Sequence, residues 1–261
     1  MKRYAALVLL GALTPSVCPA SLTEAQRKAA ESTVSVTVPT PAEFFDAIDK
    51  VSRPDWAAFY RDPGPTSFPT RPQTAFNLGA LVADGYIAVE AQDGQQVKNT
   101  GKDIIALARA LGVGENVLAR GKSIADFADK NDWFALREEL EATTNEVRRA
   151  MVDQRDEALA SLILAGAWLR SLQVGSRAAE LSGEPSGAAL LAQKELVAFL
   201  HGQLQELPEK ARTGPVVTRV GETFGAVEES MTVEEGNVPD LERAQAIHTA
   251  CAQLVAQLGA K

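Results

Sequence analysis

The chain has few of the side chains that build metal and redox centres. It contains two cysteines and two histidines in 261 residues. We predict that Cys18 is removed with a signal peptide, which leaves Cys251 without an intramolecular disulfide partner. A zinc site needs several cysteine, histidine or carboxylate ligands placed together. We therefore expect no metal and no cofactor, and a core that is stabilised by packing alone.

Motifs for phosphate binding and nucleophilic catalysis are also missing. Gly121-Lys122-Ser123 ends like a P-loop, but Asn116 stands where that loop needs its first glycine. No Gly-x-Gly-x-x-Gly follows a strand-like segment, and no Gly-x-Ser-x-Gly elbow is present. Neither His201 nor His248 has a glutamate three residues before it, as di-iron bundles require. An enzyme would therefore belong to a class that leaves none of these signatures.

Basic residues are in deficit. Lysine and arginine number 26 against 34 acidic residues, a formal net charge of −8. Loss of Lys2 and Arg3 with a signal peptide would leave 24 basic and 34 acidic residues, a net charge of −10. Nucleic acids and anionic membranes select basic surfaces. The composition thus argues against a nucleic-acid partner.

Aromatic residues and long apolar runs are scarce as well. Only 6% of the residues are aromatic, and alanine and leucine supply much of the apolar surface, which favours helix over strand. The longest apolar run beyond the N-terminus, residues 158–169, is twelve residues long. A transmembrane helix needs about 20 residues. The sequence therefore predicts an all-α fold without a transmembrane segment.

The N-terminus has the pattern of a bacterial export signal. Lys2 and Arg3 precede an apolar stretch over residues 5–13, and Cys18-Pro19-Ala20 presents small residues before a cut after Ala20. A lipoprotein acylated at Cys18 fits less well, because the three residues before it do not resemble a lipobox. We expect a periplasmic or secreted protein of the bacterial cell envelope.

The remaining chain divides into a short N-terminal segment and one large domain. Residues 21–40 are expected to contain a helix and an extended tether, with alternating valines over residues 33–38. Residues 41–261 are expected to form a single all-α domain, a multi-helix bundle or stacked helical hairpins with about nine to eleven helices in total. The expected helices cover residues 42–51, 55–61, 70–92, 95–111, 115–130, 131–154, 156–181, 186–204, 218–231 and 239–258.

A short pattern occurs twice. Asp55-Trp56 and Asp132-Trp133 each follow an Asp-Lys pair, and each predicts an aspartate N-cap with a tryptophan in the first turn. The copies are either the trace of an internal duplication or two uses of a common helix start.

The helix over residues 74–91 is apolar on nearly every side, which places it at the centre of the fold. Its exceptions include Asn77 and Asp84, two turns apart and thus on one face. A buried Asp84 needs a partner, and Arg170, at the end of another apolar run, is the leading candidate. These three residues form either a polar pocket or a structural cluster that sets helix register. Rival partners for Asp84 are Lys102, Arg109 and Arg155.

Two residues of the last helix resemble half of a metal site. His248 and Cys251 lie one turn apart, but Cys251 also belongs to an apolar stripe with Ile247 and Leu254. The simpler interpretation is that Cys251 is a core residue.

The sequence as a whole favours a non-enzymatic, exported helical domain. It would bind or scaffold a protein partner or an apolar small ligand in a groove between helices. The alternatives are a small-molecule binder with a polar pocket around Asn77 and Asp84, or an enzyme of an unrecognised class.

Overall fold

The computed structural model describes residues 39–260, apart from 184, 235 and 236. The predicted signal peptide (1–20), the helix and tether of the N-terminal segment, and the alternating valines of residues 33–38 lie outside the described residues. The described chain is helical throughout, with loops between the helices and no strand among the described residues. The prediction of an all-α bundle with about nine to eleven helices is confirmed.

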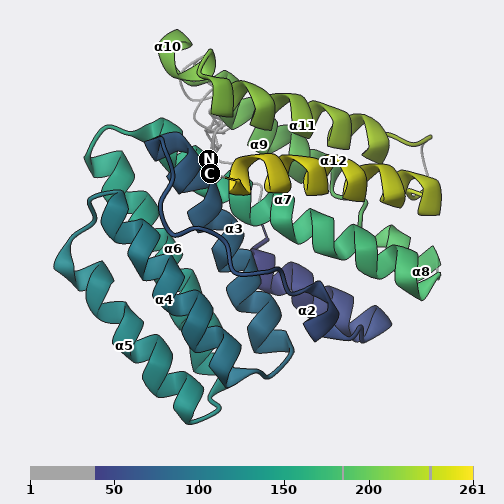
Figure 1. The fold of residues 1–261 in the computed structure, drawn as a ribbon. Coiled ribbons are helices and arrows are strands. Elements are labelled where there is room, and N and C mark those ends of the chain that lie inside the picture. Colours follow the sequence, from purple (N-terminus) through teal and green to yellow (C-terminus); the bar gives the residue numbers. More distant parts are fainter. Residues whose placement is uncertain (1–38, 184, 235–236, 261) are drawn as a thin grey trace, which may run out of the picture. The chain divides into compact units, whose positions relative to one another are not determined.

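Helices follow one another with short connections (Figure 1). In chain order they are α2 (Pro41–Ser52), the 3-10 helix η1 (Trp56–Phe59), α3 (Arg71–Glu90), α4 (Gly94–Ala110), α5 (Glu115–Asp129), α6 (Trp133–Asp153), α7 (Glu157–Ser182), α8 (Pro185–Ala189), α9 (Lys194–Gln205), α10 (Glu209–Arg212), α11 (Pro215–Met231) and α12 (Leu241–Gly259).

The long helices α3 and α7 pack against each other at the centre of this domain. On one side, α4 packs on α3, and α5 and α6 continue the layer. On the other side, α12 packs on α7, with α11 and α9 beyond it (Figure 1). Both central helices are buried along most of their length, as the nearly uniform apolar composition of α3 predicts.

Two glycines allow the central helices to touch through their backbones. A Cβ atom added to Gly79 of α3 would lie closer than 3.0 Å to the carbonyl oxygen of Ile163 on α7. A Cβ atom added to Gly166 of α7 would lie closer than 3.0 Å to the carbonyl oxygen of Phe76 on α3. The spacing between α3 and α7 therefore depends on the absence of both side chains.

The predicted helix over residues 186–204 is wrong, because the structure has the two separate helices α8 and α9 there. Two residues near the start of the segment, Ala188 and Leu191, are buried, and so are Val197 and Leu200 in its second half. At 100° per residue, one continuous helix would place these two pairs on nearly opposite faces. The break between α8 and α9 turns both pairs toward the core.

Other boundaries differ by less. The helix predicted over residues 55–61 is only the short 3-10 turn η1, and α10 was not predicted. Both aspartates of the repeated Asp-Trp pattern do cap helix starts: Asp55 accepts a hydrogen bond from the amide of Ala57, and Asp132 from that of Ala135. One cap begins a 3-10 turn and the other a long α-helix, so the two local structures differ.

Helix α7 is 26 residues long, more than twice the apolar run recognised in the sequence. By length and composition alone it is able to cross a membrane. Most of its apolar stretch is buried against other helices of the bundle, which is also the environment of a core helix.

Candidate functional site

A cavity of about 680 Å³ lies beneath the loop that joins η1 to α3. Residues 60–68 of this loop run across the front of α3 between α4 and α12 (Figure 1). The cavity walls come from the loop, from α3, α4 and α12, and from Gln173 of α7. Elements far apart in the sequence thus line one cavity. The lining side chains of α3 include Asn77 and Asp84, two of the three residues singled out from the sequence.

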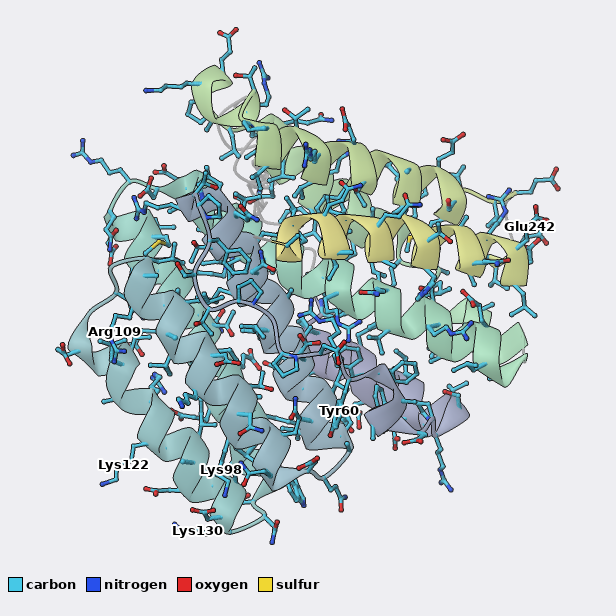
Figure 2. All side chains as sticks on the ribbon, viewed as in Figure 1. Tyr60, Lys98, Arg109, Lys122, Lys130 and Glu242 are labelled. Carbon is cyan, nitrogen blue, oxygen red and sulfur yellow. The ribbon has the colours of Figure 1, made fainter. Side chains whose placement is uncertain are left out.

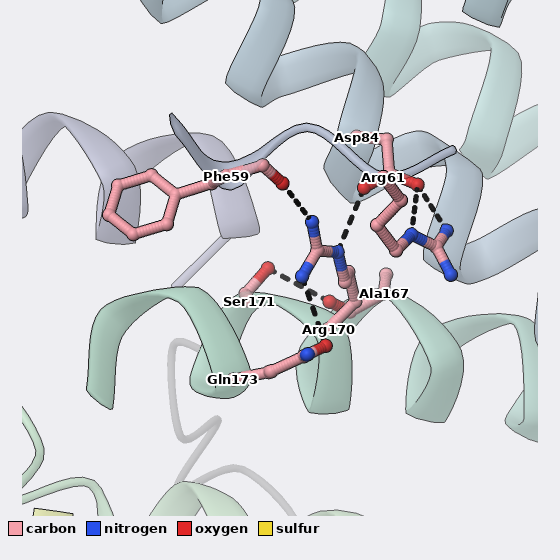
Figure 3. Close-up of polar contacts among 7 residues, drawn as sticks. All are labelled: Phe59, Arg61, Asp84, Ala167, Arg170, Ser171 and Gln173. Atoms are coloured by element: carbon pink, nitrogen blue, oxygen red, sulfur yellow. Dashed lines mark hydrogen bonds and ion pairs between the residues drawn. The ribbon is translucent and has the colours of Figure 1, made fainter. Parts of the chain in front are cut away.

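Asp84 binds two arginines at the edge of this cavity (Figure 3). Its Oδ1 accepts a hydrogen bond from Nε of Arg170 at 2.8 Å. Its Oδ2 accepts hydrogen bonds from Arg61 of the loop, one of them from Nε at 3.0 Å. The side chains of Asp84, Arg170 and Arg61 are 14%, 4% and 29% exposed. One carboxylate therefore joins α3, α7 and the loop.

Arg170 holds the start of the loop through a further contact. Its terminal nitrogens donate to the backbone oxygen of Phe59 at 2.5 Å and to Oε1 of Gln173 at 3.0 Å. Burial opposes ionisation of Asp84, but the charges of Arg170 and Arg61 outweigh it and lower the pKa of Asp84. Asp84, Arg170 and Arg61 together form the Asp84 cluster. It is therefore ionised at neutral pH, and its two positive charges share one negative charge.

Of the basic residues weighed as partners for Asp84, the structure places Arg170 against it and none of Lys102, Arg109 and Arg155. Arg61 has no local signal that marks it as a partner of Asp84, because it lies in a loop 23 residues before that aspartate. Both carboxylate oxygens of Asp84 are bonded, so its main contribution is to anchor the loop over the cavity.

Asn77 connects α3 to the end of α12. Its side-chain amide donates to the carbonyl oxygens of Gln73 at 2.9 Å and Leu258 at 2.7 Å. The side chain of Gln73 donates to the carbonyl oxygens of Leu258 and Ala260, both at 2.9 Å. The final carbonyls of a helix have no partner within it. Asn77 and Gln73 therefore fasten the end of α12 to α3 and do not join the Asp84 cluster.

Tyr60 provides a second anchor for the loop. Its hydroxyl donates to Asp93, the N-cap of α4, at 3.4 Å. Burial and the neighbouring Asp93 raise the pKa of Tyr60 to about 12. The side chain, labelled in Figure 2, is thus neutral and remains a hydrogen-bond donor at neutral pH.

The other lining side chains come mainly from α4 and α12. Helix α4 contributes amides, a hydroxyl and two charges to the lining: Gln96, Asn99, Thr100, Lys102 and Asp103. Helix α12 contributes small and apolar groups, Ala252, Val255 and Ala256. Desolvation, partly offset by Lys102, raises the pKa of Asp103. One wall is therefore polar and the opposite wall apolar.

His248 and Cys251 lie in different environments. Cys251 is fully buried in the core, and burial raises the pKa of its thiol to about 12. Nδ1 of His248 lies 3.0 Å from the backbone oxygen of Gln173. Among the described residues, no group of three or more histidine, cysteine or acidic side chains is placed to hold a metal ion.

Fold and site together define a class: an all-α helical bundle in which a loop covers a cavity lined by α3, α4 and α12. Comparisons with protein-family models, curated proteins and solved structures find no match for this chain.

Proposed function

We propose that this protein binds a small molecule in the cavity beneath residues 60–68. The observation that supports the proposal is a cavity of about 680 Å³ that has one polar and one apolar wall. Ligand pockets typically measure about 300–1,000 Å³ and combine apolar lining with a few polar groups that orient the ligand. The Asp84 cluster supports the same proposal, because it secures the covering loop to both central helices.

The lining indicates the ligand's chemistry. Asn99, Gln96 and Thr100 offer hydrogen-bond donors and acceptors, and Lys102 and Asp103 offer one charge of each sign. A ligand with hydroxyl, amide or zwitterionic groups on one side and an apolar portion on the other would match these walls.

Ala256→Trp is expected to abolish ligand retention. Ala256 is exposed on α12 at the cavity wall, so an indole there fills the cavity without entering the core. We expect native mass spectrometry of the protein isolated from its own host to show a bound small molecule, and the adduct to be lost in this variant. Ala246→Trp is the matched control, because Ala246 is exposed on the same helix and does not line the cavity.

Two results would contradict the proposed function. One is a bare mass for the wild-type protein under conditions that preserve noncovalent complexes. The other is an adduct that persists equally in both tryptophan variants, since that ligand would be bound elsewhere.

The proposal includes export. We propose that the ligand is bound in the periplasm or outside the cell, after cleavage following Ala20. For protein isolated from the native host, we expect the intact mass to equal that of a chain whose first residue is Ser21. A mass that includes Met1, found in the cytosolic fraction, would refute export; a lipid adduct on Cys18 would instead show a lipoprotein.

A further inference from the structure

A second, smaller cavity lies on another part of the bundle, between α6, α7 and α9. Its volume is about 170 Å³, enough for a single polar group and a few further atoms. The lining residues include Arg148, Glu157, Ser161, Leu164, Leu200 and Gln203. None of them lines the larger cavity, so what binds here is independent of the proposed function.

Arg148 has no counter-ion at this cavity. Its Nε is buried without a hydrogen-bond partner, and no ion pair forms with its guanidinium among the described residues. By contrast, Arg120, on the neighbouring helix α5, pairs with both Glu139 and Glu146. Desolvation lowers the pKa of Arg148, but arginine keeps its proton at any ordinary pH. The cavity therefore contains a positive charge that the surrounding protein does not neutralise.

Arg148 is half-buried, so water reaches part of its guanidinium. Its Nε–H, however, is shielded from solvent and gains no hydrogen bond from the protein in exchange. Glu157 lines the same cavity but is exposed and forms no ion pair with Arg148, so solvent screens its charge. The N-terminus of α7 also borders the cavity, and no side chain caps its amides. The positive end of a 26-residue helix therefore adds to the attraction for an anion.

We propose that this cavity is a binding site for a small carboxylate. The planar guanidinium of Arg148 matches a carboxylate in shape and donates two parallel hydrogen bonds to it. The hydroxyl of Ser161 and the amide of Gln203 line the cavity and supply further donors. Leu164 and Leu200 provide an apolar surface for the short aliphatic portion of the ligand.

The experiment is a thermal unfolding titration with sodium acetate, which replaces sodium chloride at constant pH and ionic strength. We expect acetate to raise the Tm of the wild-type protein saturably, by about 3 °C at high occupancy. Arg148→Met should abolish the rise. Arg149→Met should retain it, because Arg149 is the exposed neighbour on the same helix and lies outside the cavity.

A second measurement covers the case in which Arg148→Met fails to fold. In the wild-type protein, the Nε–H signal of Arg148 in a 1H–15N spectrum should move during the acetate titration, while that of Arg149 stays in place. The proposal is overturned if acetate and chloride give the same Tm, if the two methionine variants respond equally, or if the Arg148 signal does not move.

Discussion

Asp84→Ala is expected to destabilise the protein by about 3 kcal/mol, because it leaves two guanidinium groups without the carboxylate they share. Arg170 is almost fully buried, so its charge cannot be rehydrated without opening the fold. Equilibrium unfolding in urea at pH 7 measures the effect. An unchanged free energy of unfolding would show that the Asp84 cluster does not stabilise the domain.

Two further variants distinguish the contributions of Arg61 and Arg170 to stability. Arg61→Met should cost less, about 1 kcal/mol, because Arg61 is partly exposed and Asp84 keeps its pair with Arg170. The double variant Asp84→Leu with Arg170→Met should recover much of the loss, since it removes both buried charges together. If the double variant loses as much stability as the single variants Asp84→Leu and Arg170→Met lose in sum, the two residues do not act as a pair.

The effect of Asp84→Ala should depend on pH. The pKa of Asp84 is lowered in the folded protein, so the carboxylate binds protons more weakly there than in the unfolded chain. Its stabilisation is complete above the unfolded pKa of about 3.9 and is lost as the pH falls through the folded value. The stability difference between wild type and Asp84→Ala should therefore shrink below about pH 4. A difference that stays constant to pH 2.5 would contradict ionisation of Asp84 as its source.

The sequence predicted the centre of the fold because burial leaves a local signature. A helix that is apolar on every side has to lie inside, and α3 does. The same pattern made Asp84 conspicuous as a charge among apolar neighbours. Helix starts were predictable for the same local reason, since Asp55 and Asp132 form the N-caps that the sequence predicts.

Features that depend on tertiary packing were not predictable in this way. Arg61 lies in a proline-rich loop, where nothing local indicates that it folds back onto α3. The break between α8 and α9 contains no proline, and only the position of the core determines it. The cavity depends on α12 meeting α3 across more than 150 residues of chain, as the hydrogen bond between Asn77 and Leu258 shows.

Gly79→Ala is expected to be among the most damaging single substitutions in the chain, although it adds one methyl group. The added Cβ would lie closer than 3.0 Å to backbone atoms of Ile163 and Ala167, which cannot rotate away as a side chain can. Helices α3 and α7 would have to separate along the centre of the domain, and overpacking of this kind costs about 3 kcal/mol. Urea unfolding measures the loss.

Gly202→Ala is the matched control, because the same methyl group is added to a helix where no atom lies within 4 Å of it. Alanine is the better helix former, so this variant should gain about 0.5–1 kcal/mol. Gly166→Ala should resemble Gly79→Ala, since its Cβ meets the backbone of Phe76 across the same interface. One separation of α3 from α7 relieves both clashes, so the double variant should lose less than the sum of the single losses. Strict additivity, or equal effects at Gly79 and Gly202, would show that close backbone contact does not hold the central helices together.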